Sequence, residues 1–481
     1  MSTPADGAPG EGSGVPAGAA GADGTTILAL RRELTWRDLV VYGLLFIGVT
    51  APMGTFGVLD ARSGGAIALV FVVATVAMSF TAWSYARMSE AVPQAGSVYA
   101  YASAGLGRRA GFLAGWMVTL DYLFIPALAS LFVGIACHAL VPAVPVWVFT
   151  LVAVALTTGL NLRDVRLAAR VGLVMLAVEL VVLGAFAVLA VVYLAQHGPT
   201  RGWLTPLTGV GGLGPAGVVG AASVAVLAFL GFDAIATFAE ETTGSSRQVG
   251  RALQFCLVLA GLLFVTQTYL GALLSTATPA ALAADPEAQG TAFFAMLDAS
   301  IGPWFSTVVT VVRAVGPVFS ALVAQAAVSR LLYAMARERA LPAPLARLGT
   351  TGRTPRNAIL LSAVVTLVVA TLAATRPDGL DVLSSMVTVG ALTAFVFLHA
   401  SVVGFFRRRL GRTVWHVVVP VVGSLVIVAV LVEASRLALV IAAGWFVLGL
   451  AAMVLRPSAA RALGGGAGDV TAATGDGGPV R

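Results

Sequence analysis

Four ionisable side chains lie deep within apolar stretches of the sequence and are the first candidates for chemistry. Three are the carboxylates of Asp121, Glu179 and Asp233, and the fourth is the guanidinium of Arg313. An ionised group at the middle of a bilayer costs about 2.5–3.5 kcal/mol on insertion scales, so each of these groups needs a compensating partner. Such groups commonly mark the pathway of an ion, a proton or a charged substrate. The four residues therefore predict binding of a small charged molecule.

Several of these residues also have a structural interpretation. Asp233 is placed to cap the N-terminus of a half-helix, and Asp121 can hydrogen-bond to a neighbouring helix. Arg313 near a binding pocket would attract a carboxylate and repel a diamine, which favours an amino acid as substrate. All 29 basic residues of the chain are arginines, which stay protonated. A proton-carrying step inside the membrane must therefore use a carboxylate or a histidine.

Two apolar stretches contain residues that interrupt a helix. The first, GVTAPMGTFG, holds Pro52, which lacks an N–H group, and three glycines that tolerate non-helical torsions. The second is AFLGFDAIATFAEET. At such breaks, freed N–H groups favour a carboxylate and freed carbonyls favour an ammonium group. We therefore predict a substrate pocket between the breaks, formed by Gly48, Val49, Thr50, Ala51 and Gly54 from the first, Phe229, Gly231, Phe232 and Asp233 from the second, and Asp121.

The elements that must position these residues are apolar helices. Hydrophobic residues make up 58% of the 481 residues and charged residues only 11%, which excludes an ordinary water-soluble domain. Twelve segments approach the roughly 20 residues that a membrane-spanning helix needs, and the alternation of a membrane barrel is missing from the sequence. Spans one and six are the broken ones, and breaks at matching positions five spans apart predict an inverted repeat. The predicted spans are 38–58, 66–88, 109–138, 145–161, 170–194, 216–240, 252–276, 304–333, 358–375, 380–403, 414–432 and 437–455.

The arginines between the spans predict the orientation of the chain. With the N-terminus inside, 24 arginines lie on the cytoplasmic side, four lie outside, and Arg313 lies within a span. Cytoplasmic loops carry the excess of basic residues, so both termini are predicted to be cytoplasmic in a cell-membrane protein. Residues 1–34 and 456–481 are rich in Gly and Ala and are predicted to be disordered tails. They flank a predicted transmembrane transporter domain at 35–455.

Other function classes find little support in the sequence. The net charge of +7 comes from arginines between apolar stretches, which indicates membrane orientation and not a nucleic-acid surface. Cys137 and Cys256 supply neither a disulfide framework nor paired metal ligands, and no cofactor or metal is predicted. Neither HExxH nor GxSG occurs, so an enzyme is not expected. The expected partners are a small-molecule amino acid or amine, a coupling proton and the lipid bilayer.

Four stretches carry a family resemblance: PQAGSVYAYASAGLGRRAGFLAGW (Pro93–Trp116), GFDAIATFAEET (Gly231–Thr242), SRLLYAMARERALP (Ser329–Pro342) and RTPRNAI (Arg353–Ile359). Together they resemble the amino acid–polyamine–organocation permeases, and with the layout of the spans the resemblance covers about residues 35–455. Two further stretches are most similar to the putrescine importers within that family, namely LDYLFIP (Leu120–Pro126) and HALVPAVPVW (His138–Trp147).

The resemblance implies two inverted five-helix repeats, at about 38–194 and 216–403, plus two extra helices at about 414–455. It also implies secondary active transport of an amino acid or a putrescine-like amine by alternating access, coupled to a proton or to exchange. Glu179 falls where some relatives carry a lysine, and a carboxylate there could carry the coupling proton or act as a counter-ion for Arg313. Gly54 replaces an acid that the putrescine importers can have in the first break. An amino acid exchanger and a non-transporting sensor of the same fold are the alternatives.

Overall fold

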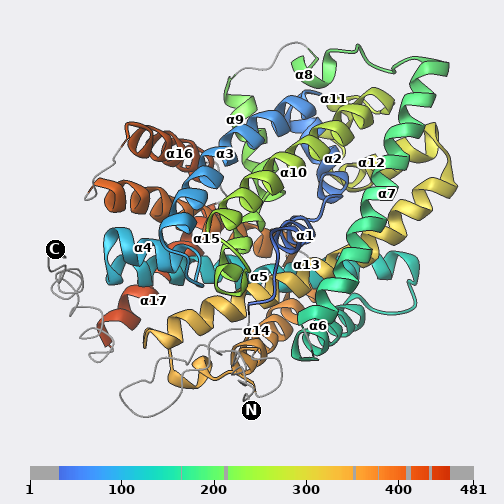
Figure 1. Ribbon diagram of the computed structural model, residues 1–481. Coiled ribbons are helices and arrows are strands. Elements are labelled where there is room, and N and C mark those ends of the chain that lie inside the picture. The colour runs from blue at the N-terminus through green and yellow to red at the C-terminus, as the bar shows by residue number, and fades with distance from the viewer. Residues whose placement is uncertain are drawn as a thin grey trace, which may run out of the picture.

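A computed structural model describes residues 32–163, 165–210, 215–349, 354–376, 379–407, 413–432 and 436–455. Over these residues the chain is largely helical, and its helices pack side by side around a common core (Figure 1). Eleven of the described helices are long and apolar enough to cross a membrane, and a bent pair of shorter helices makes a twelfth span. The prediction of an all-α protein with twelve spans is therefore confirmed for the described residues. Both predicted tails lie outside them, apart from residues 32–34.

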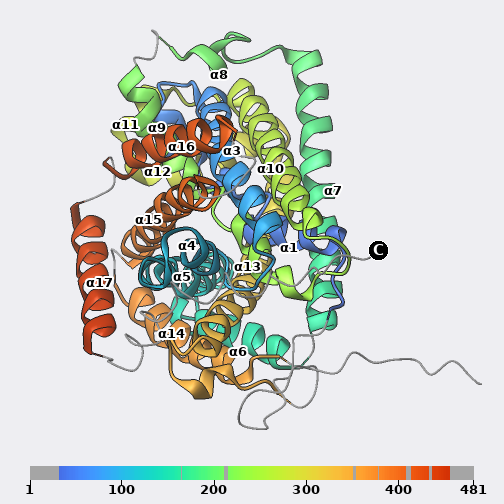
Figure 2. The same ribbon diagram turned by 60° about the vertical axis from the view of Figure 1, so that its left-hand side comes forward.

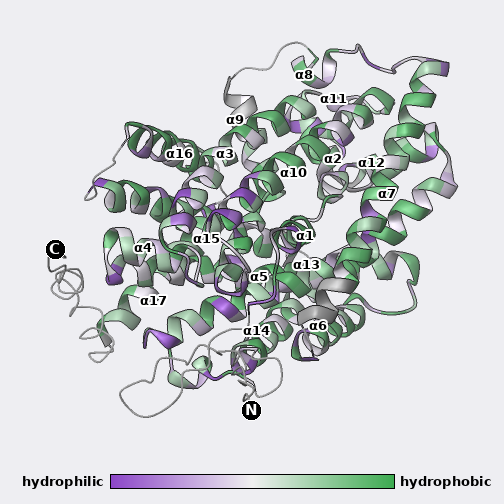
Figure 3. Ribbon diagram, viewed as in Figure 1, coloured by the Kyte–Doolittle hydropathy of each residue, from purple (hydrophilic) through white to green (hydrophobic). Residues whose placement is uncertain are grey.

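The spans follow one another in the predicted order, and apolar residues cover most of their length (Figure 3). Shorter helices connect or flank them: α4 (Val98–Leu106), α8 (Thr205–Thr208), α11 (Pro279–Ala284), α12 (Pro286–Ser300) and the 3₁₀ helix η2 (Ala343–Ala346). The spans are α1 (Trp36–Ile47) with α2 (Ala51–Arg62), α3 (Ile67–Ala91), α5 (Arg108–Leu140), α6 (Val146–Arg163), α7 (Val165–His197), α9 (Pro215–Leu227) with the 3₁₀ helix η1 (Phe232–Glu241), α10 (Arg247–Leu274), α13 (Pro303–Arg337), α14 (Arg356–Ala374), α15 (Gly379–Arg407), α16 (Trp415–Val432) and α17 (Arg436–Leu455).

The first span is broken where the sequence predicts it. A capping box starts α1, in which the Thr35 hydroxyl accepts from the Asp38 amide and the Asp38 carboxylate accepts from the Thr35 amide. The helix ends at Gly48, whose φ of +72° suits glycine and few other residues. The next helix, α2, begins at Ala51 with Pro52 in its first turn, and its axis is bent by 46° from that of α1.

The sixth span is broken as well, and its second half is unusual. The α-helix α9 ends at Leu227, a turn follows, and Gly231 adopts a φ of +111°. From Phe232 the chain continues as a 3₁₀ helix of ten residues. Runs of 3₁₀ helix longer than three or four residues are uncommon, and a stretch within a span often marks a functional hinge. The two breaks lie against each other because α1 packs on η1.

The last helix lies at the edge of the bundle. Figures 1 and 2 place α17 on the side opposite α7, and α17 packs against α5 and α15. Two tryptophans hold it: Trp116 and Trp445 stack with ring centroids 4.7 Å apart, and each indole N–H donates to the backbone carbonyl of the other residue. The predicted five-plus-five inverted repeat and its domain boundaries stay predictions.

Ion pairs, two of them buried and the Glu240–Arg337 pair partly exposed, tie the helices together at both ends of the bundle. We call the end where α1 begins and η1 ends the inner end, after the predicted orientation, and the opposite end the outer end. At the outer end, Arg201 donates to both carboxylate oxygens of Asp60, at 2.9 and 2.7 Å. At the inner end, Glu241 pairs with Arg330, and Glu240 pairs with Arg337.

Candidate functional site

A cavity of about 180 Å³ lies at the break between α1 and α2. A buried water molecule needs only about 10–15 Å³ of such volume, so this cavity accommodates a small organic molecule. Four residues predicted for the pocket line it, namely Gly48, Thr50, Ala51 and Gly54. Both charged residues that were predicted for coupling, Glu179 and Arg313, line it as well.

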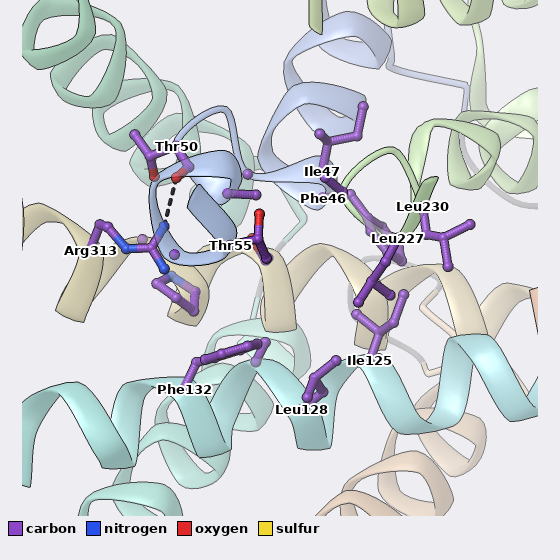
Figure 4. A pocket seen from close by; sticks show the side chains of 18 of the residues that line it. Phe46, Ile47, Thr50, Thr55, Ile125, Leu128, Phe132, Leu227, Leu230 and Arg313 are labelled. Carbon is purple, nitrogen blue, oxygen red and sulfur yellow. Dashed lines mark hydrogen bonds between the residues drawn. The ribbon is translucent and has the colours of Figure 1, made fainter. Parts of the chain in front are cut away.

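The polar end of the cavity is built around Arg313 of α13. Its Nη1 donates to the carbonyl of Thr50 at 2.6 Å, so the guanidinium binds the backbone at the start of α2 (Figure 4). Gly54 makes this position possible, because a Cβ at residue 54 would overlap Nη2 and lie 3.1 Å from Cζ of the arginine. The absence of an acid at residue 54 thus leaves room for a cation.

Glu179 of α7 supplies the opposite charge. Its carboxylate packs against Gly316, where a side chain would overlap Oε1. The charge of Glu179 interacts with that of Arg313, and the Glu179 side chain is almost fully buried. One cavity therefore holds a permanent cation and a carboxylate on two different helices.

Two carbonyls at the first break are bound by residues that the sequence analysis missed. Ser320 of α13 donates its hydroxyl to the carbonyl of Leu45 at 2.6 Å. Gln267 of α10 donates its amide N–H to the carbonyl of Val49 at 3.0 Å. The only signal for either residue in the sequence is a polar side chain within an apolar span. Together with Arg313 these donors hold the broken segment in place.

The opposite end of the cavity is apolar. Phe46, Leu227 and Leu230 lie there, away from Arg313, and Ile125 and Leu128 of α5 form an adjoining wall (Figure 4). An apolar surface of this kind suits the hydrocarbon part of a ligand. The cavity therefore has a charged end and a hydrocarbon end.

The other residues predicted for the pocket do not line this cavity. The Val49 side chain is buried, and Phe229 and Phe232 pack into the core through aromatic contacts. Gly231 lies behind Phe46, whose ring a side chain at residue 231 would overlap.

Asp121 and Asp233 are both fully buried, and their charges interact with each other. The second break thus contributes only its turn, Ala228 and Leu230, to the cavity wall.

Polar contacts join several elements at the inner end of the bundle. The short helix α4 lies there, and Tyr99 on α4 donates its hydroxyl to Glu338 at 2.6 Å. Burial, together with the neighbouring Glu338 charge, raises the pKa of the Tyr99 phenol, so Tyr99 stays a neutral donor. The backbone N–H of Ala95 donates to Glu240, which is itself bound to Arg337. Polar contacts therefore join the loop before α4 to the end of η1.

Comparison with known proteins agrees with these features. Residues 39–456 match the family profile described as amino acid permease. The low-affinity putrescine importer PlaP of Escherichia coli is 28% identical, over 89% of this chain and 94% of its own length. The branched-chain amino acid permease BcaP of Bacillus subtilis is 26% identical over 79% of this chain and 82% of its own. The vacuolar cationic amino acid transporter 2 of Arabidopsis thaliana is 28% identical over 78% of this chain and 59% of its own.

Proposed function

The chain belongs to the amino acid permease family, and from that premise we propose that it is a secondary active transporter that takes up a zwitterionic amino acid across the cell membrane by alternating access, driven by a proton gradient. The family and the relatives indicate a membrane transporter of amino acids or amines and not an enzyme. The favoured substrate class and the proton coupling are the parts that the proposal adds.

One observation supports the substrate class: the cavity carries opposite charges on separate helices. An amino acid would place its carboxylate on Arg313 and its ammonium group near Glu179. A diamine would bring two cations beside a fixed guanidinium, which is unfavourable in a desolvated site. The side chain of the amino acid would lie along the apolar wall.

A putrescine-like diamine is the second candidate. PlaP is a low-affinity putrescine importer, and its similarity extends over 89% of this chain and 94% of its own length. Asp121 and Asp233 offer two buried carboxylates that lie outside the cavity, and no described arginine forms an ion pair with either. Under this alternative, replacing either acid would raise the Km for the diamine strongly, whereas replacing Arg313 would not.

Uptake into proteoliposomes separates the two candidates. The purified protein is reconstituted and offered a radiolabelled panel of neutral, branched-chain and cationic amino acids and of diamines, with and without an imposed pH gradient. We expect accumulation of an amino acid. Arg313→Gln should raise its Km about 10- to 150-fold, since a charge-assisted hydrogen bond contributes about 1.5–3 kcal/mol. A parent that transports only diamines, with Arg313→Gln unaffected, would overturn the proposed substrate class.

Coupling is tested at Glu179, the carboxylate that lines the cavity. Glu179→Gln mimics the protonated form permanently, so counterflow at saturating substrate should persist, with a raised Km, while gradient-driven accumulation is lost. Loss of both activities would instead support a counter-ion role beside Arg313. Retention of both would remove Glu179 from coupling, and counterflow without any response to pH in the parent would favour an exchanger.

A further inference from the structure

Three aromatic side chains from three helices meet at the inner end of the bundle. The ring centroid of Trp83 of α3 lies 5.7 Å from that of His416 of α16, and His416 stacks on Phe406 of α15 at 4.1 Å. The guanidinium carbon of Arg87, one turn further along α3, lies 5.7 Å from the Trp83 ring. Arg407 follows Phe406, ends α15 and is exposed. We call these five residues the inner-end cluster, and none of them lines the substrate cavity.

A buried histidine holds the three helices together next to the cluster. His399 of α15 lies within hydrogen-bonding distance of two hydroxyls of α3, with Nδ1 2.9 Å from Ser84 and Nε2 3.3 Å from Thr81. A Cβ at Gly423 of α16 would overlap the His399 ring. The helices α3, α15 and α16 also pack against one another (Figures 1 and 2). The cluster is therefore built on rigid, mutually fixed helices.

Several N–H donors of the cluster are not used by the described part of the protein. His416 Nδ1 accepts from the backbone N–H of Thr413 at 3.2 Å, so the proton of the neutral ring lies on Nε2. Neither this Nε2–H nor the indole N–H of Trp83 donates to a described residue. Arg87 is half-buried and forms an ion pair with Glu90 at 3.4 Å, while its Nε has no acceptor among the described residues.

The charge of the cluster suits an anion. Arg87 and Arg407 stay protonated, and Glu90 beside Arg87 compensates only one of these two charges. His416 and Trp83 add neutral donors. A phosphodiester carries one negative charge and presents oxygens that accept charge-assisted hydrogen bonds from groups of this kind. The chemistry that fits the cluster is therefore a phosphate group.

The position of the cluster indicates a membrane lipid as the source of that phosphate. Arg87 lies near the end of α3, Arg407 is the last residue of α15, and His416 lies in the first turn of α16. Each residue is thus placed where a spanning helix leaves the hydrocarbon and reaches the headgroups. Tryptophan is typical of the same interface.

The face of α3 that carries Trp83 and Arg87 continues as an apolar stripe. Val76 and Val72 lie on this face, because steps of four, seven and four residues separate the four side chains. The two valines are 54% and 38% exposed. From Arg87 to Val72 the helix rises about 22 Å, which exceeds the roughly 15 Å of hydrocarbon in one leaflet. The stripe is long enough to contact a whole acyl chain.

We propose that the inner-end cluster binds the headgroup phosphate of an anionic phospholipid, whose acyl chain lies along the stripe of α3. The guanidinium of Arg87 and the Nε2–H of His416 donate to phosphate oxygens, and the indole N–H of Trp83 donates to an oxygen of the glycerol ester. Arg407 contributes its charge. A lipid bound in this way joins α3 to α15 and α16 from outside the bundle. The proposal does not rest on the proposed function, because lipid binding is measured without transport.

Native mass spectrometry of the delipidated full chain in a non-ionic detergent tests the preference for an anionic lipid. The first dioleoyl phosphatidylglycerol should bind more tightly than dioleoyl phosphatidylcholine, which has the same chains and no net charge. Arg87→Gln should weaken phosphatidylglycerol binding about fivefold or more, since one basic residue near an anionic headgroup contributes about that factor. Its binding of phosphatidylcholine should stay unchanged.

Arg163→Gln is the matched control, because it removes an exposed arginine from the last turn of α6, which Figures 1 and 2 place away from α3 and α16. It should bind both lipids like the parent. Equal affinity of the parent for the two lipids, or parent-like phosphatidylglycerol binding by Arg87→Gln, would overturn the proposal. Displacement of phosphatidylglycerol by an equal concentration of glycerol 3-phosphate would also overturn it, because the site would then recognise a free phosphate.

A second measurement locates the lipid and covers the case in which Arg87→Gln inserts poorly. Phosphatidylglycerol with brominated chains should quench the tryptophan fluorescence of the solubilised parent more than brominated phosphatidylcholine does. Trp83→Phe keeps an aromatic ring and should lose this excess, whereas Trp203→Phe, which removes an exposed tryptophan at the outer end, should retain it. Retention of the full excess by Trp83→Phe would overturn the proposal. If the parent transports no compound of the panel, the proposed function fails, and both lipid measurements still decide on this site.

Discussion

Replacement of Gly54 by alanine should weaken substrate binding by displacing Arg313 while leaving the protein folded. The new Cβ would overlap Nη2 and lie 3.1 Å from Cζ, whereas non-bonded atoms settle at about 3.5–4.0 Å. A shift of roughly 1 Å would stretch the 2.6 Å bond from Nη1 to the Thr50 carbonyl beyond hydrogen-bonding range. The displaced guanidinium would also lose its charge-assisted bond to the substrate carboxylate, about 1.5–3 kcal/mol, which predicts a Km about 10- to 150-fold higher for an amino acid.

The assay is initial uptake against substrate concentration, normalised to the amount of inserted protein. Gly184→Ala is the matched control, because it makes the same substitution within a spanning helix at a position with no atom within 4 Å. In the Arg313→Gln background, Gly54→Ala should raise the Km no further, since the displaced group is already gone. An unchanged Km in Gly54→Ala, or fully additive effects in the double variant, would refute the argument that Gly54 acts through Arg313.

Three further outcomes are expected. Gly231→Leu should insert but lose uptake, because φ is +111° at this residue and the new side chain would overlap the ring of Phe46. Normal uptake by a normally expressed variant would show that the second break is not needed for transport. Glu241→Gln should lower the free energy of unfolding of the solubilised protein by about 3–5 kcal/mol, because it leaves Arg330 buried without a counter-ion. An unchanged melting temperature would contradict the contribution of that pair. In a background with Cys137 and Cys256 replaced by alanine, cysteines introduced at residues 20 and 470 should resist an impermeant reagent in intact cells, and labelling of either would refute the predicted orientation.

The number and order of the spans could be predicted from the sequence because they depend on local composition. A helix that crosses a bilayer must be long and apolar by itself, whatever its neighbours are. The breaks are local as well: Pro52 removes a donor, and Gly48 and Gly231 adopt positive φ angles that most residues avoid. The four buried charged residues were visible for the same reason, since each interrupts an apolar stretch.

Which of these residues share a cavity could not be predicted. Asp121 and Asp233 were predicted for the pocket with Gly54, yet neither lines the cavity, whereas Glu179 and Arg313 line it from α7 and α13. Ser320 and Gln267, which bind the carbonyls of the break, were not predicted at all. Such contacts depend on how each helix is rotated about its axis.

A membrane span that is apolar on every face gives little information about that rotation, because lipid and protein interior favour the same side chains. The sequence by itself therefore determined the helices, their breaks and the inventory of charged groups. Only the packing of α5, α7, α13 and η1 against the first break decided that one cation and one acid line a cavity while two other acids are buried away from it.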